Sequence, residues 1–367
     1  MSNKRIKKKR AKEWRSCALC GKPLWGQERV IGKTGRGVCQ DCLRVAGLLL
    51  GSGKKETCPV ASGIVTPAQM LRELDKAIIG QEDAKRAIAV AFWKQQMRAA
   101  GAKLPNCGLL LYGPTGCGKT ALAREAARIA GLPFVAFDAT TLTEAGYRGN
   151  SADDMVKQLI EKYGKTAAKK GVVFLDEVDK LSARGDSARM AYSRGTQHSL
   201  LKLIEGKEVE GVDTSGLLFL FGGAFTGLGK KERRMNAIGF ERVQQEEEKH
   251  AIQMEDFITF GMERELMGRI SRCVRLKALE KADLRRILRE SELSAFYRYE
   301  KFCASRGLKL EMDDETEETI IQTALKRGLG ARGLNGLVEE WVESELMELA
   351  ERGEAYEREA IHQTGGF

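Results

Sequence analysis

The sequence predicts a protein of the α/β class, in which a parallel sheet is preceded by a small metal-binding module and followed by a helical domain. Three observations predict this architecture: apolar runs that alternate with helical segments, a helix-rich C-terminal part, and two Cys-x2-Cys pairs near the N-terminus. The expected divisions are a basic tail at 1–15, a zinc-binding domain at 16–45, a linker at 46–65, a large α/β domain at 66–276, a small α domain at 277–355 and a tail at 356–367.

The sheet is predicted from five short apolar runs that do not alternate with polar residues. Continuous apolar runs are typical of parallel strands that are covered on both faces. The expected strands are 107–112, 133–137, 172–175, 217–221 and 273–276. Helices are expected from Thr66-Pro67 and over 83–100, and then in the C-terminal part over 281–305, 315–327 and 332–351, with a short strand at 308–312.

A glycine-rich loop with the pattern Gly-x4-Gly-Lys-Thr follows the first of these strands and precedes a segment of strong helix formers at 121–130. Such glycines let backbone N–H groups face a phosphate, and the following helix adds its positive N-terminal end. Lys119 can then reach the β- and γ-phosphates, and the Thr120 hydroxyl can ligate Mg²⁺. The loop predicts an ATP-type site formed by Gly113, Pro114, Thr115, Gly116, Cys117, Gly118, Lys119 and Thr120.

Two acidic residues end the apolar run at 171–175. Ligands of parallel sheets bind at the carboxyl ends of the strands, so these acids are expected beside the phosphate loop. Asp176 is the candidate for the Mg²⁺ shell, and Glu177 is the candidate that polarises the attacking water. Together with the loop they predict hydrolysis of a nucleoside triphosphate.

Four of the nine cysteines have the spacing of a structural zinc site. Cys17 and Cys20 are separated by eighteen residues from Cys39 and Cys42, so each Cys-x2-Cys pair can supply two thiolates to one Zn²⁺. Four thiolates leave no open position on the metal, so the predicted zinc is structural. The other cysteines are scattered and are expected to be thiols.

The net charge of +10 is concentrated at the N-terminus. Residues 1–15 hold eight basic residues and one glutamate, a balance of +7, which leaves +3 for the rest of the chain. The body shows no groove-reading helix or stacking platform, which argues against nucleic acid as the partner. The chain shows no apolar run of membrane-spanning length and no secretory signal, so a cytoplasmic protein without a membrane partner is expected.

With these motifs in hand, the chain resembles the ClpX family of hexameric AAA+ unfoldases, which pass proteins to the ClpP peptidase. The resemblance covers roughly 15–350 and rests on the four cysteines, the nucleotide motifs and several further segments. These are Ile79-Gly80-Gln81-Glu82, 138–146, Leu200-Leu-Lys-Leu-Ile-Glu-Gly206, Gly222-Gly-Ala-Phe225, Ile238-Gly239-Phe240 and Gly330-Ala-Arg-Gly-Leu334. It implies an AAA+ fold with a small helical domain, ATP, Mg²⁺ and Zn²⁺ as cofactors, and a homohexamer that acts on protein substrates.

The resemblance also implies roles for single residues. Ile78, Ile79 and Ala121 would belong to the nucleotide pocket, with the two isoleucines at the adenine. Arg269 looks like the arginine finger that reaches a neighbouring subunit, and Arg332 looks like the sensor-2 arginine of the small domain. Tyr147 and Arg148 would lie in the substrate pore, while Ile238, Gly239 and Phe240 would dock to a ClpP-like peptidase. Adaptors are further candidate partners.

Three departures mark the chain as a divergent member. The pore segment is Gly-Tyr-Arg-Gly, with Arg148 where the family has valine. The basic pore-entrance loop expected near Gly206–Gly211 is missing, and the N-terminal basic arm is an addition. We considered three competing functions: a remodelling chaperone that works without a peptidase, a nucleic-acid motor or loader, and a zinc-module adaptor with an inactive ATPase.

Arg148 generates a testable prediction. Several copies of its guanidinium around a narrow channel would repel one another and would favour acidic segments of a threaded chain. We expect Arg148→Val to lower the ratio of acidic to basic tagged substrates that are processed, measured in competition with both substrates present. An unchanged ratio would contradict this role for Arg148.

Overall fold

The computed structural model describes residues 29–31, 36–38, 63–105, 108–142, 151–183, 187–229, 252–305 and 309–364. The chain divides into two units, Met1–Thr57 and Cys58–Phe367. In the first unit the described residues form two short antiparallel strands, β1 (Arg29–Ile31) and β2 (Arg36–Val38). The four cysteines of the expected zinc site lie outside the described residues.

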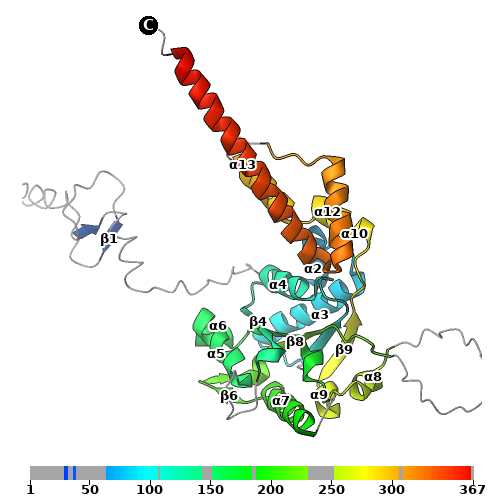
Figure 1. Cartoon of the computed structure of the whole chain (residues 1–367). Coiled ribbons are helices and arrows are strands. Elements are labelled where there is room, and N and C mark those ends of the chain that lie inside the picture. The colour runs from blue at the N-terminus through cyan, green and yellow to red at the C-terminus, as the bar shows by residue number, and fades with distance from the viewer. Residues whose placement is uncertain are drawn as a thin grey trace, which may run out of the picture. The chain divides into compact units, whose positions relative to one another are not determined.

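The second unit contains the predicted parallel sheet. Its five strands are β3 (Gly108–Tyr112), β4 (Phe134–Asp138), β5 (Val172–Asp176), β8 (Leu218–Gly223) and β9 (Ile270–Arg275). Their order in the sheet is β4-β5-β8-β3-β9, and all neighbours pair in parallel. Strand β3, which precedes the phosphate loop, therefore lies between two neighbours, and β9 lies at the edge (Figure 1).

The strands alternate their side chains between two cores. Leu111, Phe174 and Leu220 point to one face of the sheet, where they join a core with α2 (Pro67–Ala77), α3 (Glu82–Ala99) and α4 (Lys119–Ala130). Leu110 and Phe221 point to the other face and join residues of α5 (Ala152–Tyr163), α7 (Ser187–Glu205), α8 (Met254–Thr259) and α9 (Arg264–Gly268). Burial of both faces explains why these strands are apolar throughout.

Smaller elements connect these layers. They are the short helix α6 (Lys165–Ala168), the hairpin strands β6 (Glu208–Val209) and β7 (Val212–Asp213), and three 3-10 turns, η1 (Ala139–Thr141), η2 (Val178–Leu181) and η3 (Thr214–Gly216). The hairpin occupies the segment where the pore-entrance loop was expected, and its two strands are joined by Glu210 and Gly211.

The edge strand β9 differs from its predicted bounds. β9 begins at Ile270, three residues before the expected start at Cys273. Within its first half only Ile270 is buried, while Ser271 and Arg272 are exposed. The N-terminal half of β9 therefore lacks the continuous apolar run by which the other four strands, including the second edge strand β4, were found.

The C-terminal part consists of four helices around a separate core: α10 (Lys281–Glu290), α11 (Ala295–Ser305), α12 (Asp314–Arg327) and α13 (Gly330–Thr364). The helix expected over 281–305 is broken at 291–294, where the Ser294 hydroxyl donates to the carbonyl oxygen of Leu288. Asp313 caps α12, since its carboxylate accepts from the Thr316 N–H.

Two expectations for this part were wrong. Among the described residues of the expected strand at 308–312, none is in a strand, although Leu310 and Met312 are buried in the helical core. Their alternating burial resembles a strand pattern, but none of the described strands pairs with them. Helix α13 also continues to Thr364, beyond the expected end at 351 and into the expected tail. Within the described ranges, no helix has the length and apolar character needed to cross a membrane.

The sheet core generates a stability prediction. Phe174 on β5 is fully buried and stacks on Phe134 of β4 with ring centroids 6.5 Å apart. We expect Phe174→Ala to lower the free energy of unfolding of the sheet domain by about 3–5 kcal/mol, measured by urea unfolding with circular dichroism. The matched control is Phe302→Ala on α11, whose residue is 51% exposed and whose loss should cost far less. Equal losses in the two variants would contradict the assignment of Phe174 to the core.

Candidate active site

The phosphate loop connects β3 to α4 and passes very close to backbone of other segments. A Cβ atom added at Gly113 would lie 2.4 Å from the carbonyl oxygen of Leu276, and one added at Gly116 would lie 2.0 Å from that of Leu329. Gly116 also has a φ of 77°, in the left-handed region. Both positions therefore require glycine because a Cβ atom has no room there. At Gly116 the left-handed backbone is a second reason.

Lys119 begins α4 and is buried, with its ammonium group inside the loop. The Nζ atom donates to the carbonyl oxygens of Gly113 at 2.7 Å and Pro114 at 2.9 Å. No carboxylate pairs with Lys119 in the described part of the chain. Its partners among the described residues are these two carbonyl oxygens and the Cys117 sulfur at 4.0 Å, and an anionic phosphate would be a stronger partner.

Thr120 and Asp176 meet as the sequence predicted. The Thr120 hydroxyl donates to Oδ2 of Asp176 at 2.5 Å, across the gap between the start of α4 and the end of β5. A hydroxyl and a carboxylate oxygen are the ligand types that Mg²⁺ prefers, so this pair fits the metal. Gly222 of β8 leaves room for the Asp176 carboxylate, because a Cβ atom at Gly222 would lie 2.8 Å from Oδ1 of Asp176.

Glu177 follows directly and is exposed. Its backbone is left-handed, with φ 57° and ψ 31°, a conformation that non-glycine residues adopt at a cost of order 1–3 kcal/mol. The Glu177 N–H donates to Oδ1 of Asp176 at 3.0 Å, which helps to hold this turn. Of the two consecutive acids, Asp176 is therefore bonded to Thr120 of the loop, while Glu177 is exposed.

The two isoleucines expected at the adenine separate in the structure. Ile78 is buried in the core that covers the sheet, whereas Ile79 is buried in the core of the helical domain. The backbone between them therefore runs from one domain to the other. An adenine at this point would contact both domains, and Cys117 of the loop, which is also buried in the sheet-side core, lies in the same region.

Arg332 lies beside the loop, on the helical domain. The Ala331 N–H donates to the carbonyl oxygen of Gly116 at 3.1 Å, so the first turn of α13 touches the phosphate loop directly. The Arg332 side chain is exposed and makes no ion pair with the described residues.

Arg269 lies at the opposite end of the sheet. Its carbonyl oxygen accepts from the N–H of Gly108, the first residue of β3, at 2.9 Å, whereas the phosphate loop follows the last residue of that strand. The four steps along β3 from Gly108 to Tyr112 cover about 13 Å at 3.3 Å per step. The guanidinium of Arg269 is paired with Glu205 at the end of α7. Arg269 therefore lies far from the loop of its own chain.

Several predicted site residues lie outside the described residues: Cys17, Cys20, Cys39, Cys42, Tyr147, Arg148, Ile238, Gly239 and Phe240. Among the residues that the structure describes, no group of three or more His, Cys, Asp or Glu side chains could hold a metal ion. Sequence reasoning also missed one residue at the site, Gln81, which was noted only as part of a motif. Nothing in its local sequence signals the hydrogen bond that its side chain donates to the Cys117 carbonyl oxygen of the loop.

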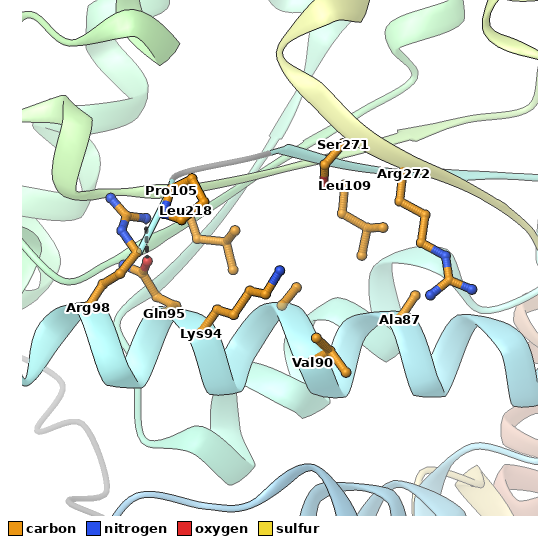
Figure 2. A pocket seen from close by; sticks show the side chains of 11 residues that line it. Ala87, Val90, Lys94, Gln95, Arg98, Pro105, Leu109, Leu218, Ser271 and Arg272 are labelled. Carbon is orange, nitrogen blue, oxygen red and sulfur yellow. Dashed lines mark hydrogen bonds between the residues drawn. The ribbon is translucent and has the colours of Figure 1, made fainter. Parts of the chain in front are cut away.

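A hollow of about 260 Å³ lies away from the phosphate loop, along α3 and the N-terminal ends of β3, β8 and β9. Figure 2 shows Lys94, Arg98 and Arg272 around an apolar floor that includes Leu109 and Leu218. Arg98 donates to Oε1 of Gln95 at 3.0 Å. None of the predicted nucleotide-site residues lines this hollow, so it is distinct from the candidate active site.

Cys117 generates a pH prediction. Burial raises the pKa of its thiol, against the opposing effect of Lys119, so the reactive thiolate forms at higher pH than in a free cysteine. We expect its alkylation by iodoacetamide to be slow at about pH 8 and to rise at higher pH, measured by peptide mass spectrometry. ATP should slow the reaction at Cys117. Cys273 on β9, where burial raises the pKa to about 11, serves as the control that ATP should not protect. Equal protection of both thiols would contradict nucleotide binding at this loop.

Comparison with known proteins agrees with this geometry. Residues 109–232 match the family "ATPase family associated with various cellular activities (AAA)", and residues 279–362 match the C-terminal, D2-small domain of ClpB protein. The chain is 33% identical over 371 residues to the ATP-dependent Clp protease ATP-binding subunit ClpX of Borrelia duttonii and to that of Borrelia recurrentis. Each match covers 91% of this chain and 86% of the relative. The parallel sheet with its phosphate loop, the helical domain beside it and the extent of these matches show that the chain is an ATPase and a divergent member of the ClpX family of AAA+ proteins.

Proposed function

We propose that this protein hydrolyses ATP at the interface between neighbouring subunits of a homohexameric ring and uses the cycle to unfold and thread proteins. The observation that carries the proposal is the position of Arg269. It lies at the end of the sheet opposite to its own phosphate loop, so an arginine finger at this position can act only on the nucleotide of another chain. A site that needs a residue from a second chain needs an oligomer.

Each residue of the site would have its own role at the phosphates. Lys119 would leave the carbonyl oxygens of Gly113 and Pro114 for the β- and γ-phosphates, and the backbone N–H groups of the loop would hold the phosphate chain. Thr120 and Asp176 would hold Mg²⁺, which neutralises phosphate charge when it is bound. Glu177 would orient and polarise the attacking water, and the neighbouring subunit's Arg269 would stabilise the charge of the transition state.

The helical domain would transmit the nucleotide state. Arg332 lies one residue after Ala331, which is hydrogen-bonded to the loop, so a phosphate that attracts Arg332 would also move the start of α13. In the family-based assignment this movement reaches Tyr147 and Arg148 in the pore, which grip the substrate chain. Cys17, Cys20, Cys39 and Cys42 would hold a structural Zn²⁺ in the N-terminal domain, and Ile238, Gly239 and Phe240 would dock to a ClpP-like peptidase.

The test of the mechanism is Glu177→Gln. Removal of the carboxylate should leave ATP binding intact and lower the ATPase turnover by at least a hundredfold, the usual scale for loss of a general base. Unfolding of a tagged fluorescent protein should be lost in parallel. The matched control is Glu161→Gln on α5, an exposed glutamate away from the loop, which should behave like the parent protein. Retained unfolding by Glu177→Gln would refute the assignment.

The peptidase partnership is tested separately. Deletion of 238–240 should abolish co-purification with a ClpP-type peptidase in the presence of ATP while it leaves the ATPase rate unchanged. If no peptidase co-purifies with the parent protein and the deletion changes no activity, the protein is a remodelling chaperone that works alone.

A further inference from the structure

The side-chain amide of Gln81 joins the phosphate loop to the segment that leads into the helical domain. Its Nε2 atom donates to the carbonyl oxygen of Cys117 at 3.4 Å and to that of Lys277 at 2.9 Å. Its Oε1 atom accepts from the Lys277 N–H at 2.9 Å. We call these three contacts the Gln81 bridge. Only one orientation of the amide satisfies both backbone groups of Lys277, so the donor and acceptor assignment is fixed.

The backbone around Gln81 is shaped to make this bridge. Gly80 and Gln81 have φ angles of 67° and 60°, so two consecutive residues are left-handed. Gln81 is then the N-cap of α3, yet its side chain makes no capping hydrogen bond. A non-glycine residue in this conformation costs of order 1–3 kcal/mol, and such a cost persists only where surrounding contacts enforce it. Here the side-chain contacts reach two other segments, while the backbone carbonyl oxygen of Gln81 accepts from the Lys85 N–H of α3.

The bridge lies where the two domains meet. On one side of it, Ile78 is buried in the core over the sheet and Ile79 in the core of the helical domain. On the other side, the Leu276 N–H donates to the carbonyl oxygen of Tyr112, the residue before the phosphate loop, at 2.7 Å. The chain therefore crosses between the domains twice, at 78–79 and at 276–277, and Gln81 ties the second crossing to the loop.

The turn between α10 and α11 adds a second attachment to the same region. The Ser291 hydroxyl donates to the carbonyl oxygen of Ala77 at 2.5 Å, and the Glu292 N–H donates to that of Lys76 at 3.1 Å. These contacts fasten the helical domain to the end of α2, just before the first crossing. A shift of the helical domain would therefore be passed to 76–81 and, through the Gln81 bridge, to the carbonyl of Cys117.

We propose that Gln81 is a positioning residue that couples occupancy of the phosphate loop to the position of the helical domain, by a path independent of Arg332. ATP fixes the backbone of the loop, including the Cys117 carbonyl that faces Gln81. The fixed carbonyl strengthens the Gln81 bridge, and the bridge holds Lys277 and with it the start of the helical domain. The proposal rests on ATP binding, which is shared by the family, and is independent of protein unfolding and of any peptidase.

Thermodynamic linkage gives this coupling a measurable form. If ATP strengthens the Gln81 bridge by some factor, the bridge must strengthen ATP binding by the same factor. The Lys277 N–H reports the bridge directly, because Oε1 of Gln81 is its hydrogen-bond acceptor. Hydrogen exchange at this amide and the affinity for nucleotide must therefore change together.

The experiment uses the full chain with Mg²⁺ and a non-hydrolysable ATP analogue. Gln81→Asn keeps the amide and tolerates the left-handed backbone, but it is one methylene too short to form the bridge. We expect the analogue to slow exchange of the Lys277 amide in the parent protein and to lose that effect in Gln81→Asn. The dissociation constant of the analogue should rise roughly three- to tenfold, the change expected from one or two ordinary hydrogen bonds. Gln81→Glu keeps the acceptor for Lys277 but places oxygen against two carbonyl oxygens, and it should also weaken nucleotide binding.

The matched control is Gln96→Asn. Gln96 also lies on α3, is buried, and bonds backbone groups of Val65 and Ala130, but it has no contact with the loop. This variant should lower the melting temperature while it leaves both the dissociation constant and the nucleotide effect on Lys277 unchanged. The proposal is overturned if Gln81→Asn keeps the parent's affinity and protection, or if Gln96→Asn weakens nucleotide binding to the same extent.

Discussion

The structure depends on the close approach between the backbone of the phosphate loop and backbone from the segments that follow the sheet. The carbonyl oxygens of Leu276 and Leu329 lie so close to Gly113 and Gly116, respectively, that a Cβ atom at either glycine would overlap them. Gly330 has φ 56° and lies against Gly116, so glycine is needed on both sides of this contact. Because backbone meets backbone without intervening side chains, a displacement of the loop has no flexible group to absorb it. The nucleotide loop and the helical domain must therefore move as connected parts.

The sheet supports this arrangement by fixing where each functional group begins. Strand β3 is paired on both sides and covered on both faces, so the residue at which the loop starts is held by two ladders of hydrogen bonds and two cores. Strand β5, next but one, ends in Asp176 at the same edge, which places the carboxylate at the hydroxyl of Thr120. Because β9 is also parallel, Arg269, which comes directly before β9, lies at the opposite end of the strands. The parallel pairing thus brings Thr120 and Asp176 together and places Arg269 at the opposite end of the strands.

Three residues at the junction of the domains, Ile78, Ile79 and Gln81, are held by two different kinds of contact. Ile78 and Ile79 are adjacent and chemically identical, yet they are buried in different cores. Burial of each side chain makes the peptide between them a fixed crossing point. Gln81, only partly buried, contributes through directed hydrogen bonds. Apolar contacts thus fix where the chain crosses, while the Gln81 amide links the backbone of Lys277, on the return crossing, to the Cys117 carbonyl oxygen of the loop.

The sequence by itself determined β3, β4, β5 and β8, the phosphate loop and the two acids at the end of β5, because continuous apolar runs and the glycine spacing are local consequences of burial and of phosphate binding. Only the tertiary structure decided the early start of edge strand β9, the absence of a strand among the described residues of 308–312, and the continuation of α13 to Thr364. Each of these depends on which neighbour is present to cover or pair with the segment, and no local pattern records that neighbour. The separation of Ile78 from Ile79 and the reach of Gln81 to Lys277, 196 residues away, likewise arise only when distant parts of the chain come together.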